Sequence, residues 1–259
     1  MSIIERERMQ IGIIPGSGYD EFLDGGEKIQ VRTSYGEVEV REMKTGKVKT
    51  FILNRHGRGA AIPANKINHR ANIAALRQLK VDRIIAISAV GSLQKSIRVG
   101  DLVLLDQFID FSSCSVSFED KYIDVSEPFC EQLRSIILKT AKALELEFKF
   151  KLKFKLHPRG TYICVRGPRY ETKAEIKAFQ KLGGDVIGMT IAPECALARE
   201  IGTCYAAVSL ATNFAAGIEK AKLSHQKVLQ VCAEKREKLE ELILRVLPEI
   251  PADKKCRCS

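Results

Sequence analysis

The segment Gln10–Gly18 has the sequence QIGIIPGSG, a short apolar run that ends in a turn of proline, glycine and serine. An isoleucine-rich run bounded by turn residues predicts a buried β-strand. Glycines in the turn let backbone N–H groups approach an anion closely, and the Ser17 hydroxyl is a further donor. The turn is not a dinucleotide fingerprint, because Glu21 occupies the third glycine position, and no P-loop lysine follows. It predicts a strand followed by an anion site of low specificity.

Strand-like runs alternate with helix-like runs along the rest of the chain, which predicts an α/β layered domain. The predicted strands are Gln10–Ile14, Val48–Asn54, Arg83–Ala89, Leu102–Phe108, Thr161–Val165, Val186–Met189 and Cys204–Leu210. The predicted helices are Asn65–Leu79, Pro128–Leu144, Thr172–Leu182, Pro193–Ile201 and Ser224–Val246. Thr172 and Glu175 form a capping box, and Pro193 suits a first helical position. We expect one domain over residues 1–250 and a polar tail over residues 251–259.

The composition is that of a globular protein, with 259 residues of which 45% are hydrophobic and 29% charged. Apolar runs end well before the ~18 residues of a membrane helix. Charged residues Glu5–Arg8 occupy the place of a signal peptide's apolar core, so we expect a cytoplasmic protein without membrane contact. Lysine and arginine total 42 against 32 acidic residues, a net charge of +10 that suits nucleic acid or phosphate-bearing substrates.

Part of the positive charge lies in Phe148–Leu156, where lysine alternates strictly with phenylalanine and leucine. The alternation predicts a strand with one basic, solvated face. A nucleic-acid surface would carry aromatic residues on the exposed face as well, whereas here they share the opposite face. The pattern therefore favours a solvated edge strand over a nucleic-acid site.

Six of the eight cysteines lie singly in apolar or mixed segments, as buried thiols in a reducing compartment do. The other two, Cys256 and Cys258, form a Cys-x-Cys pair near the end of the chain. Two thiols alone make an incomplete metal site, since structural zinc takes four ligands. A redox role and an unconstrained tail both remain open for this pair.

Three further strand ends carry small or cationic residues that suit an anion. Arg55 and His56 follow one predicted strand, and guanidinium and imidazole N–H groups are good donors to phosphate. Ser88–Ser92 forms a second such end. The Thr190 hydroxyl lies near the start of a predicted helix, where anions are favoured. With the Gly-Ser-Gly turn, four strand ends thus carry residues that suit an anion, more than we expect by chance.

Taken together, these segments resemble the trimeric nucleoside phosphorylase family, which includes purine nucleoside and methylthioadenosine phosphorylases. The resemblance covers residues 10–250 and its motifs are specific in combination. They are Gly16–Gly18, Arg55–Gly57, Asn65–Asn72, Ser88–Leu93, Gly100–Val103, Asp106–Asp110, Glu127–Cys130, Gly160–Tyr162, Gly167–Thr172, Gly188–Thr190 and Pro193–Glu194. The resemblance implies a single α/β domain with a mixed central sheet flanked by helices, assembled as a homotrimer or, alternatively, a hexamer.

The implied reaction, part of purine salvage, cleaves the glycosidic bond of a purine nucleoside with inorganic phosphate as co-substrate. It needs no metal and no organic cofactor. The implied phosphate ligands are Ser17, Arg55, His56, Ala89 through its backbone, and Thr190. The implied substrate-binding residues are Tyr170, Glu171, Met189, Asn213 and His225, and catalytic roles are implied for Asn213, His56 and Glu171. A neighbouring subunit would complete the sugar pocket, with Tyr122 or Phe118 as the candidate.

Two positions bear on the substrate within this resemblance. Asn213 and Ala215 occupy the places where adenine-using members carry an Asp-x-Asp pattern, and an amide can pair with N7 and a 6-oxo group. Glu171 can accept from N1–H, which adenine lacks. Both residues favour 6-oxopurines. His225 occupies the place of a histidine that meets the ribose 5′-hydroxyl, whereas members that use methylthio sugars have an apolar residue there.

We therefore expect a phosphorylase of inosine and guanosine. The near alternative is a phosphorylase of methylthioinosine or methylthioadenosine. The distant alternatives are a basic nucleic-acid-binding protein that uses the lysine-rich segment and a thiol-redox protein that uses Cys256 and Cys258. Neither distant alternative accounts for the Gly167–Thr172 or Gly188–Thr190 motifs.

Overall fold

The centre of the computed structural model is strand β5 (Arg83–Ser92), most of whose side chains are buried. Strand β1 (Gln10–Ile14) pairs with it in parallel along one edge, and β11 (Cys204–Phe214) pairs in parallel along the other. Parallel strands covered on both faces need near-continuous apolar sequence, which all three have. The structure describes residues 9–258 except for 20, 47, 58, 60, 114, 115, 148–154 and 221.

The sheet continues beyond β1 through strand β4 (Val48–Ile52), which is parallel to β1. A hairpin of β3 (Gly36–Thr45) and β2 (Glu27–Thr33) then follows, and both of its pairings are antiparallel. This side of the sheet therefore already mixes the two strand directions.

The other side of the sheet is built from shorter strands. Strand β10 (Val186–Gly188) is antiparallel to β5, and β9 (Thr161–Val165) and β7 (Gln107–Phe111) follow in parallel. A branch leaves β11 through the antiparallel β6 (Leu102–Leu104) to β8 (Leu156–His157). The expected mixed central sheet is confirmed.

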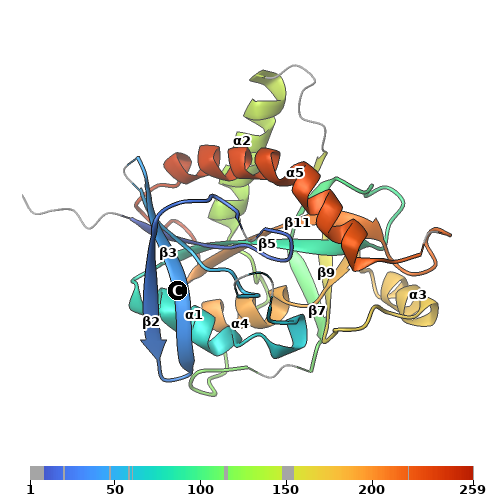
Figure 1. Ribbon diagram of the computed structural model, residues 1–259, viewed down its shortest axis with the longest axis horizontal. Coiled ribbons are helices and arrows are strands. Elements are labelled where there is room, and N and C mark those ends of the chain that lie inside the picture. Colours follow the sequence, from blue (N-terminus) through green and yellow to red (C-terminus); the bar gives the residue numbers. More distant parts are fainter. Residues whose placement is uncertain are drawn as a thin grey trace, which may run out of the picture.

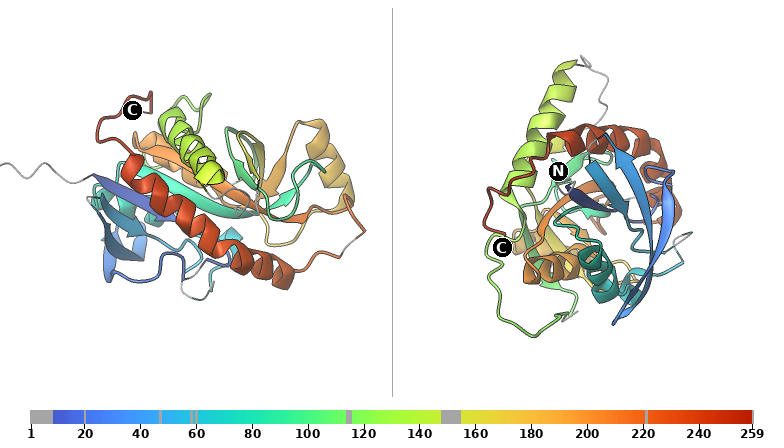
Figure 2. Two further views of the ribbon diagram at one scale, coloured as in Figure 1. Left: turned by 90° about the horizontal axis from the view of Figure 1, so that it is seen from above. Right: turned by 90° about the vertical axis from the view of Figure 1, so that its left-hand side faces the viewer.

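Helices cover both faces of this sheet, as Figure 1 and the right-hand view of Figure 2 show. Helices α2 (Glu131–Glu147) and α5 (His225–Val246) lie on one face and share an apolar core with it. Helices α1 (His69–Gln78) and α4 (Ile191–Glu200) lie on the other face over a second core.

The remaining helical segments are short. Helix α3 (Lys173–Lys181) packs at the β9–β10 end of the sheet. Single 3-10 turns occur at Ala64–Lys66 and Leu247–Glu249. None of the helices in the described part of the chain is long and apolar enough to cross a membrane.

Most predicted elements are present, but several differ in extent or partner. The predicted strand Leu102–Phe108 is wrong as a single element, because its halves are β6 and β7, which pair with different partners on either side of Leu105-Asp106. The β2–β3 hairpin was not predicted. Three helices begin elsewhere than predicted: α1 at His69 and not Asn65, α2 at Glu131 and not Pro128, and α4 at Ile191 and not Pro193. The capping box of Thr172 and Glu175 is confirmed, with both of its hydrogen bonds present.

The two chain segments that sequence analysis singled out for their charge or thiols differ in outcome. Residues 148–154 of the lysine-rich segment lie outside the described residues. The C-terminal tail is held and not unconstrained, since Arg83 donates to the carbonyl oxygens of Pro251 and Ala252 at 2.9 Å each. Cys258 is 6% exposed, which places it in the core under α2 and α5.

Candidate active site

A gap in the sheet creates the site. Along one edge of β5, strand β1 pairs only as far as Ala86, and β10 joins the same edge only at Gly91. Residues 87–90 lie between these two pairings, where β1 has already turned away at Ile14. A place where neighbouring strands diverge at the carboxyl ends of parallel strands is where α/β sheets bind ligands.

A cavity of about 410 Å³ opens at this gap. All ten residues that sequence analysis assigned to phosphate or substrate within one chain line it, and they come from seven separate segments of the chain. They are Ser17, Arg55, His56, Ala89, Tyr170, Glu171, Met189, Thr190, Asn213 and His225. We call Ser17, Arg55, His56 and Thr190 the inner end of the cavity, and Glu171, Asn213 and His225 the outer end.

The turn after β1 brings Ser17 to the inner end. Gly18 has φ +78° and faces the Cys232 side chain so closely that an added Cβ would lie 2.7 Å from Cys232 Cβ. Only glycine fits this conformation and this spacing, and the turn in consequence carries Ser17 over the gap. Ser17 Oγ lies 3.2 Å from His56 Nε2.

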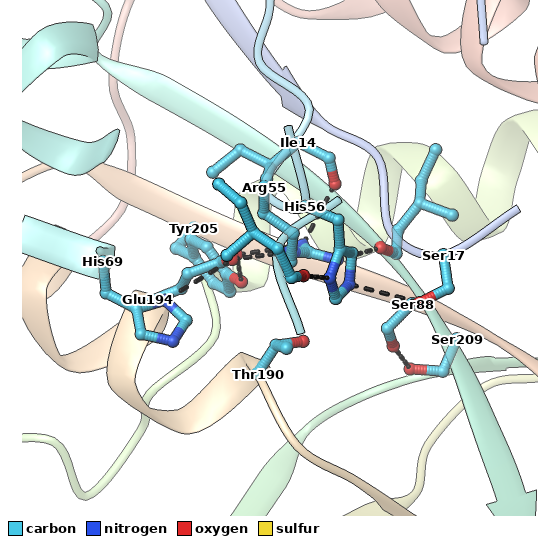
Figure 3. A network of polar contacts seen from close by, with 12 residues as sticks. Ile14, Ser17, Arg55, His56, His69, Ser88, Thr190, Glu194, Tyr205 and Ser209 are labelled. Atoms are coloured by element: carbon cyan, nitrogen blue, oxygen red, sulfur yellow. Dashed lines mark hydrogen bonds and ion pairs between the residues drawn. The ribbon is translucent and has the colours of Figure 1, made fainter. Parts of the chain in front are cut away.

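A hydrogen bond at Nδ1, the second ring nitrogen, fixes the orientation of the His56 ring. His56 Nδ1 lies 2.8 Å from the carbonyl oxygen of Ile62, which can only accept, so Nδ1 carries a proton. In the neutral ring, Nε2 then accepts from the Ser17 hydroxyl, and in the protonated ring it is a donor into the cavity. Figure 3 shows Ser17, His56 and Thr190 gathered around one space.

Thr190 occupies the residue before helix α4, but its hydroxyl makes no capping hydrogen bond. Its backbone N–H donates to the Tyr162 hydroxyl at 3.2 Å, and the residue is 6% exposed. A buried hydroxyl beside a helix N-terminus can donate to an anion that the helix dipole also favours.

Arg55 is the most deeply buried residue of the inner end, and it forms an ion pair with Glu194 of α4. Nε and Nη2 of Arg55 donate to the two carboxylate oxygens at 2.5 and 3.0 Å, and the side chains are 1% and 0% exposed. Further hydrogen bonds run to the carbonyl oxygens of Ile87 and Ile14. Burial lowers the pKa of Arg55, but the Glu194 carboxylate more than offsets this and raises it.

This pairing changes the way in which Arg55 can act. Four of the five N–H groups of Arg55 donate to described residues. The guanidinium group therefore cannot donate two parallel hydrogen bonds to a phosphate. One Nη1 hydrogen and the positive charge remain for the cavity. Tyr205 donates to Glu194 at 2.9 Å and holds the carboxylate in turn (Figure 3).

His69 completes the surroundings of Glu194 as a neutral ring. Its Nδ1 lies 3.8 Å from Glu194 Oε1. Burial lowers the pKa of His69 to about 4, so Arg55 is the partner that balances the Glu194 charge near neutral pH.

Asn213 reaches the outer end because β11 bulges there. Ala211 pairs with Val90 and Asn213 with Gly91, so Thr212 is an extra residue in the register. A bulge of this kind re-aims the following side chain. Thr212 Oγ1 donates to Asn213 Oδ1 at 3.0 Å, and Asn213 Nδ2 donates to the Phe214 carbonyl oxygen at 3.0 Å.

The loop before α3 supplies the wall opposite Asn213. Gly167 has φ +65° and packs against the Met189 thioether, where a Cβ would clash. Tyr170 is 36% exposed, and Glu171 is half-buried. Burial raises the pKa of the Glu171 carboxyl, since desolvation disfavours its charged form.

His225 is the first residue of α5 and lies exposed at the mouth of the cavity. Val228, one turn later, is 7% exposed and lines the same wall. Tyr122 is fully exposed, and the Phe118 ring packs against Tyr35 with centroids 5.4 Å apart. Neither Tyr122 nor Phe118 is among the residues that line this cavity.

Sequence analysis did not assign roles to Glu194, Tyr205 and the buried Ser88–Ser209 pair, whose hydroxyl oxygens lie 2.7 Å apart. Glu194 carried a usable signal, because it is an acidic residue in the apolar sequence Ile191–Leu197. A carboxylate in such a setting needs a buried partner. Sequence did not identify Arg55 as this partner, because the two residues are 139 positions apart.

Comparison with known proteins gives a consistent result. The model of the phosphorylase superfamily matches residues 10–248. A 6-oxopurine nucleoside phosphorylase from Pyrococcus furiosus is 44% identical over 96% of both chains. An S-methyl-5′-thioadenosine phosphorylase from Pyrococcus horikoshii is 40% identical, again over 96% of both. Methylthioadenosine phosphorylase from Schistosoma mansoni with adenine superposes with a TM-score of 0.87 at 30% identity, covering 95% of this chain and 93% of the other.

Proposed function

The chain belongs to the phosphorylase superfamily and is an enzyme of the nucleoside phosphorylase class, and from that premise we propose that it cleaves 6-oxopurine nucleosides. Inosine or guanosine reacts with inorganic phosphate and gives the free purine and ribose 1-phosphate. The observation that carries the choice of base is an amide, Asn213, on the β11 bulge, facing the same cavity as Glu171.

Phosphate binds at the inner end in this proposal. The Ser17 and Thr190 hydroxyls, His56 Nε2 and the Ala89 backbone are its ligands, and Arg55 supplies positive charge from below. The transition state resembles an oxocarbenium sugar with a departing purine anion. Phosphate held close to the anomeric carbon is both the nucleophile and a compensating negative charge.

The purine binds at the outer end. The Asn213 amide pairs with N7 and the 6-oxo group as electrons collapse into the imidazole ring of the base, and Glu171 accepts from N1–H. An adenine offers neither N1–H nor a 6-oxo group, so buried polar groups would be left unpaired at about 1–3 kcal/mol each. Tyr170 packs against the base or sugar, Met189 against the ribose, and His225 bonds to its 5′-hydroxyl.

A second candidate is a methylthioinosine phosphorylase, in which the same residues would recognise the purine base. Val228 favours it, because this apolar side chain lines the cavity one helical turn from His225 and could contact a methylthio group. A relative named as a probable S-methyl-5′-thioinosine phosphorylase, from Thermodesulfovibrio yellowstonii, is 38% identical over 98% of this chain. The exposed polar His225 favours the ribose hydroxyl.

The test measures purine release from inosine, guanosine, adenosine, methylthioinosine and methylthioadenosine, each with and without phosphate. We expect phosphate-dependent release from inosine and guanosine. Faster release from methylthioinosine would overturn the sugar assignment, and release from adenosine at the same rate would overturn the base assignment.

We further propose a homotrimer in which Tyr122 of one subunit completes the sugar pocket of the next. Its full exposure in one chain supports an intermolecular contact. Native mass spectrometry should give three chains or a multiple of three. A monomer with full activity would contradict the shared pocket.

A further inference from the structure

Four thiols that are far apart in the sequence meet at the end of β11 opposite Asn213. They are Cys130, Cys204, Cys256 and Cys258, which we call the cysteine cluster. All four sulfur atoms lie within 4.8 Å of one another, and Cys204 Sγ and Cys256 Sγ are 3.3 Å apart. All four are free thiols. The two thiols of the tail, too few for a metal on their own, are thus joined by two from the body of the domain.

We propose that the cysteine cluster binds one structural Zn²⁺ ion. Zinc takes four thiolates at about 2.3 Å in a tetrahedron, which sets the sulfur atoms about 3.8 Å apart. The cluster satisfies this spacing with small shifts and contributes sulfur only, the ligand that soft, closed zinc sites prefer.

The surroundings of the thiols suit a closed metal site. Cys130, Cys204 and Cys258 are 1%, 0% and 6% exposed, and Cys256 is half-buried. Cys130 directly precedes helix α2, whose N-terminal dipole stabilises a thiolate. Water is therefore largely excluded from the ligands, as in structural sites that hold no substrate.

Positive charge is available to balance the site. Binding converts Zn²⁺ and four thiols into a tetrathiolate with two negative charges and releases four protons. Lys255 and Arg257 flank the tail cysteines. Arg199 Nη2 donates to the Arg257 carbonyl oxygen at 3.3 Å, while its Nε and Nη1 are buried without a hydrogen-bond partner among the described residues. A metal-bound thiolate is an acceptor suited to such donors.

Hydrogen bonds hold the C-terminal tail so that Cys256 and Cys258 lie beside Cys130 and Cys204. Gln132, in the first turn of α2, donates from Nε2 to the Asp253 carbonyl oxygen at 3.2 Å. Its Oε1 accepts from the Lys255 backbone N–H at 3.1 Å. These contacts hold Lys255, which precedes Cys256, beside Gln132, which lies two residues after Cys130. Zinc would then fasten the C-terminal tail to the starts of α2 and β11.

The site is structural and not part of the chemistry. Cys204 and Asn213 are nine residues apart on one strand, or about 30 Å at about 3.3 Å per residue. Pairing the thiols as two disulfides would need an oxidant to accept four electrons, and neither the chain nor phosphorolysis supplies one.

The test is the zinc content of the full-length, untagged protein, purified with a thiol reductant and no chelator and measured by mass spectrometry of the elements. We expect about one zinc per chain. C256S/C258S should lose it and melt at a lower temperature while it keeps its nucleoside phosphorylase activity. C195S is the matched control, because Cys195 is equally buried and free but lies outside the cysteine cluster; it should keep the zinc.

Cobalt substitution is a second readout that does not depend on activity. Co²⁺ added to the metal-free protein should give the visible absorption of a tetrahedral thiolate site, and this should be absent in C256S/C258S. The proposal is overturned if the reduced protein holds no stoichiometric zinc, if its four thiols are found as disulfides, or if the double variant keeps the metal.

Discussion

The two ends of the cavity are built in different ways. At the inner end, Glu194 of α4 and Tyr205 of β11 hold Arg55 in place, and all three side chains are at most 1% exposed. The outer end is carried by a β-bulge, a loop and the first residue of a helix, with Asn213 and Glu171 half-buried and His225 exposed. Rigid packing thus holds the groups assigned to phosphate, while the groups assigned to the nucleoside lie where the chain can change at little cost to the core.

Removal of the Glu194 charge should disrupt the inner end of the cavity and have the largest effect on stability and activity. Glu194→Gln leaves Arg55 as a buried, unpaired cation, at a cost of about 3–5 kcal/mol in the free energy of unfolding. Phosphorolysis should fall together with stability, because Arg55 loses its fixed position. Denaturant unfolding and kcat/KM for phosphate measure the two effects.

Tyr205→Phe is the matched control, since it removes one hydrogen bond to Glu194 and no charge. Its cost should be about 1 kcal/mol. Equal losses in the two variants would show that the carboxylate charge is unimportant and that only the hydrogen-bond network matters.

At the outer end, Asn213→Asp should alter specificity without loss of the fold. A protonated carboxyl can donate to N7 from its hydroxyl and accept from a 6-amino group on its carbonyl oxygen, whereas an ionised one repels a 6-oxo group. The ratio of kcat/KM for inosine to that for adenosine should fall by ~10–100-fold, as expected for one buried polar group. Thermal unfolding should change little.

Asn213→Ala distinguishes a change in base recognition from a general loss of activity. It should slow inosine cleavage with no gain for adenosine, because it offers no polar atom to either base. A gain for adenosine in both variants would contradict the pairing assigned to the amide.

The pH dependence of kcat/KM should reveal a further property of the outer end of the cavity, with a smaller effect than the substitutions above. Glu171 accepts from the base more strongly as a carboxylate than as a neutral carboxyl, and its pKa is raised by burial. As pH falls through this raised pKa, the carboxyl takes up a proton, so kcat/KM for inosine should fall at a higher pH than an ordinary glutamate would allow.

Glu171→Gln cannot ionise, so its profile should lack this acid limb, with activity lowered by ~10-fold at neutral pH. The measurement is kcat/KM against pH for both proteins. An unchanged acid limb in the variant would show that another group causes it.

Sequence patterns predicted local features better than pairings between distant residues. The ten residues proposed for the site lie at strand ends or helix starts with recognisable turns, and all ten line one cavity. The Arg55–Glu194 pair, 139 residues apart, could not be found this way, and neither could the cysteine cluster. The β2–β3 hairpin did carry a local signal that the predicted strands left out, since Val38 and Val40 alternate with glutamates as in a strand with one buried face.

The smallest expected effect is at the cavity mouth. His225→Val replaces a polar side chain with an apolar one beside Val228, so a ribose 5′-hydroxyl loses a partner and a methylthio group gains contact. The ratio of kcat/KM for inosine to that for methylthioinosine should fall by ~5–10-fold, since one exposed hydrogen bond is worth about 1 kcal/mol. Gln226→Val is the control, because it makes the same kind of change on the next residue, which does not line the cavity. An unchanged ratio in His225→Val would mean that the sugar is recognised elsewhere, and the difference between the two ends would then concern the base alone.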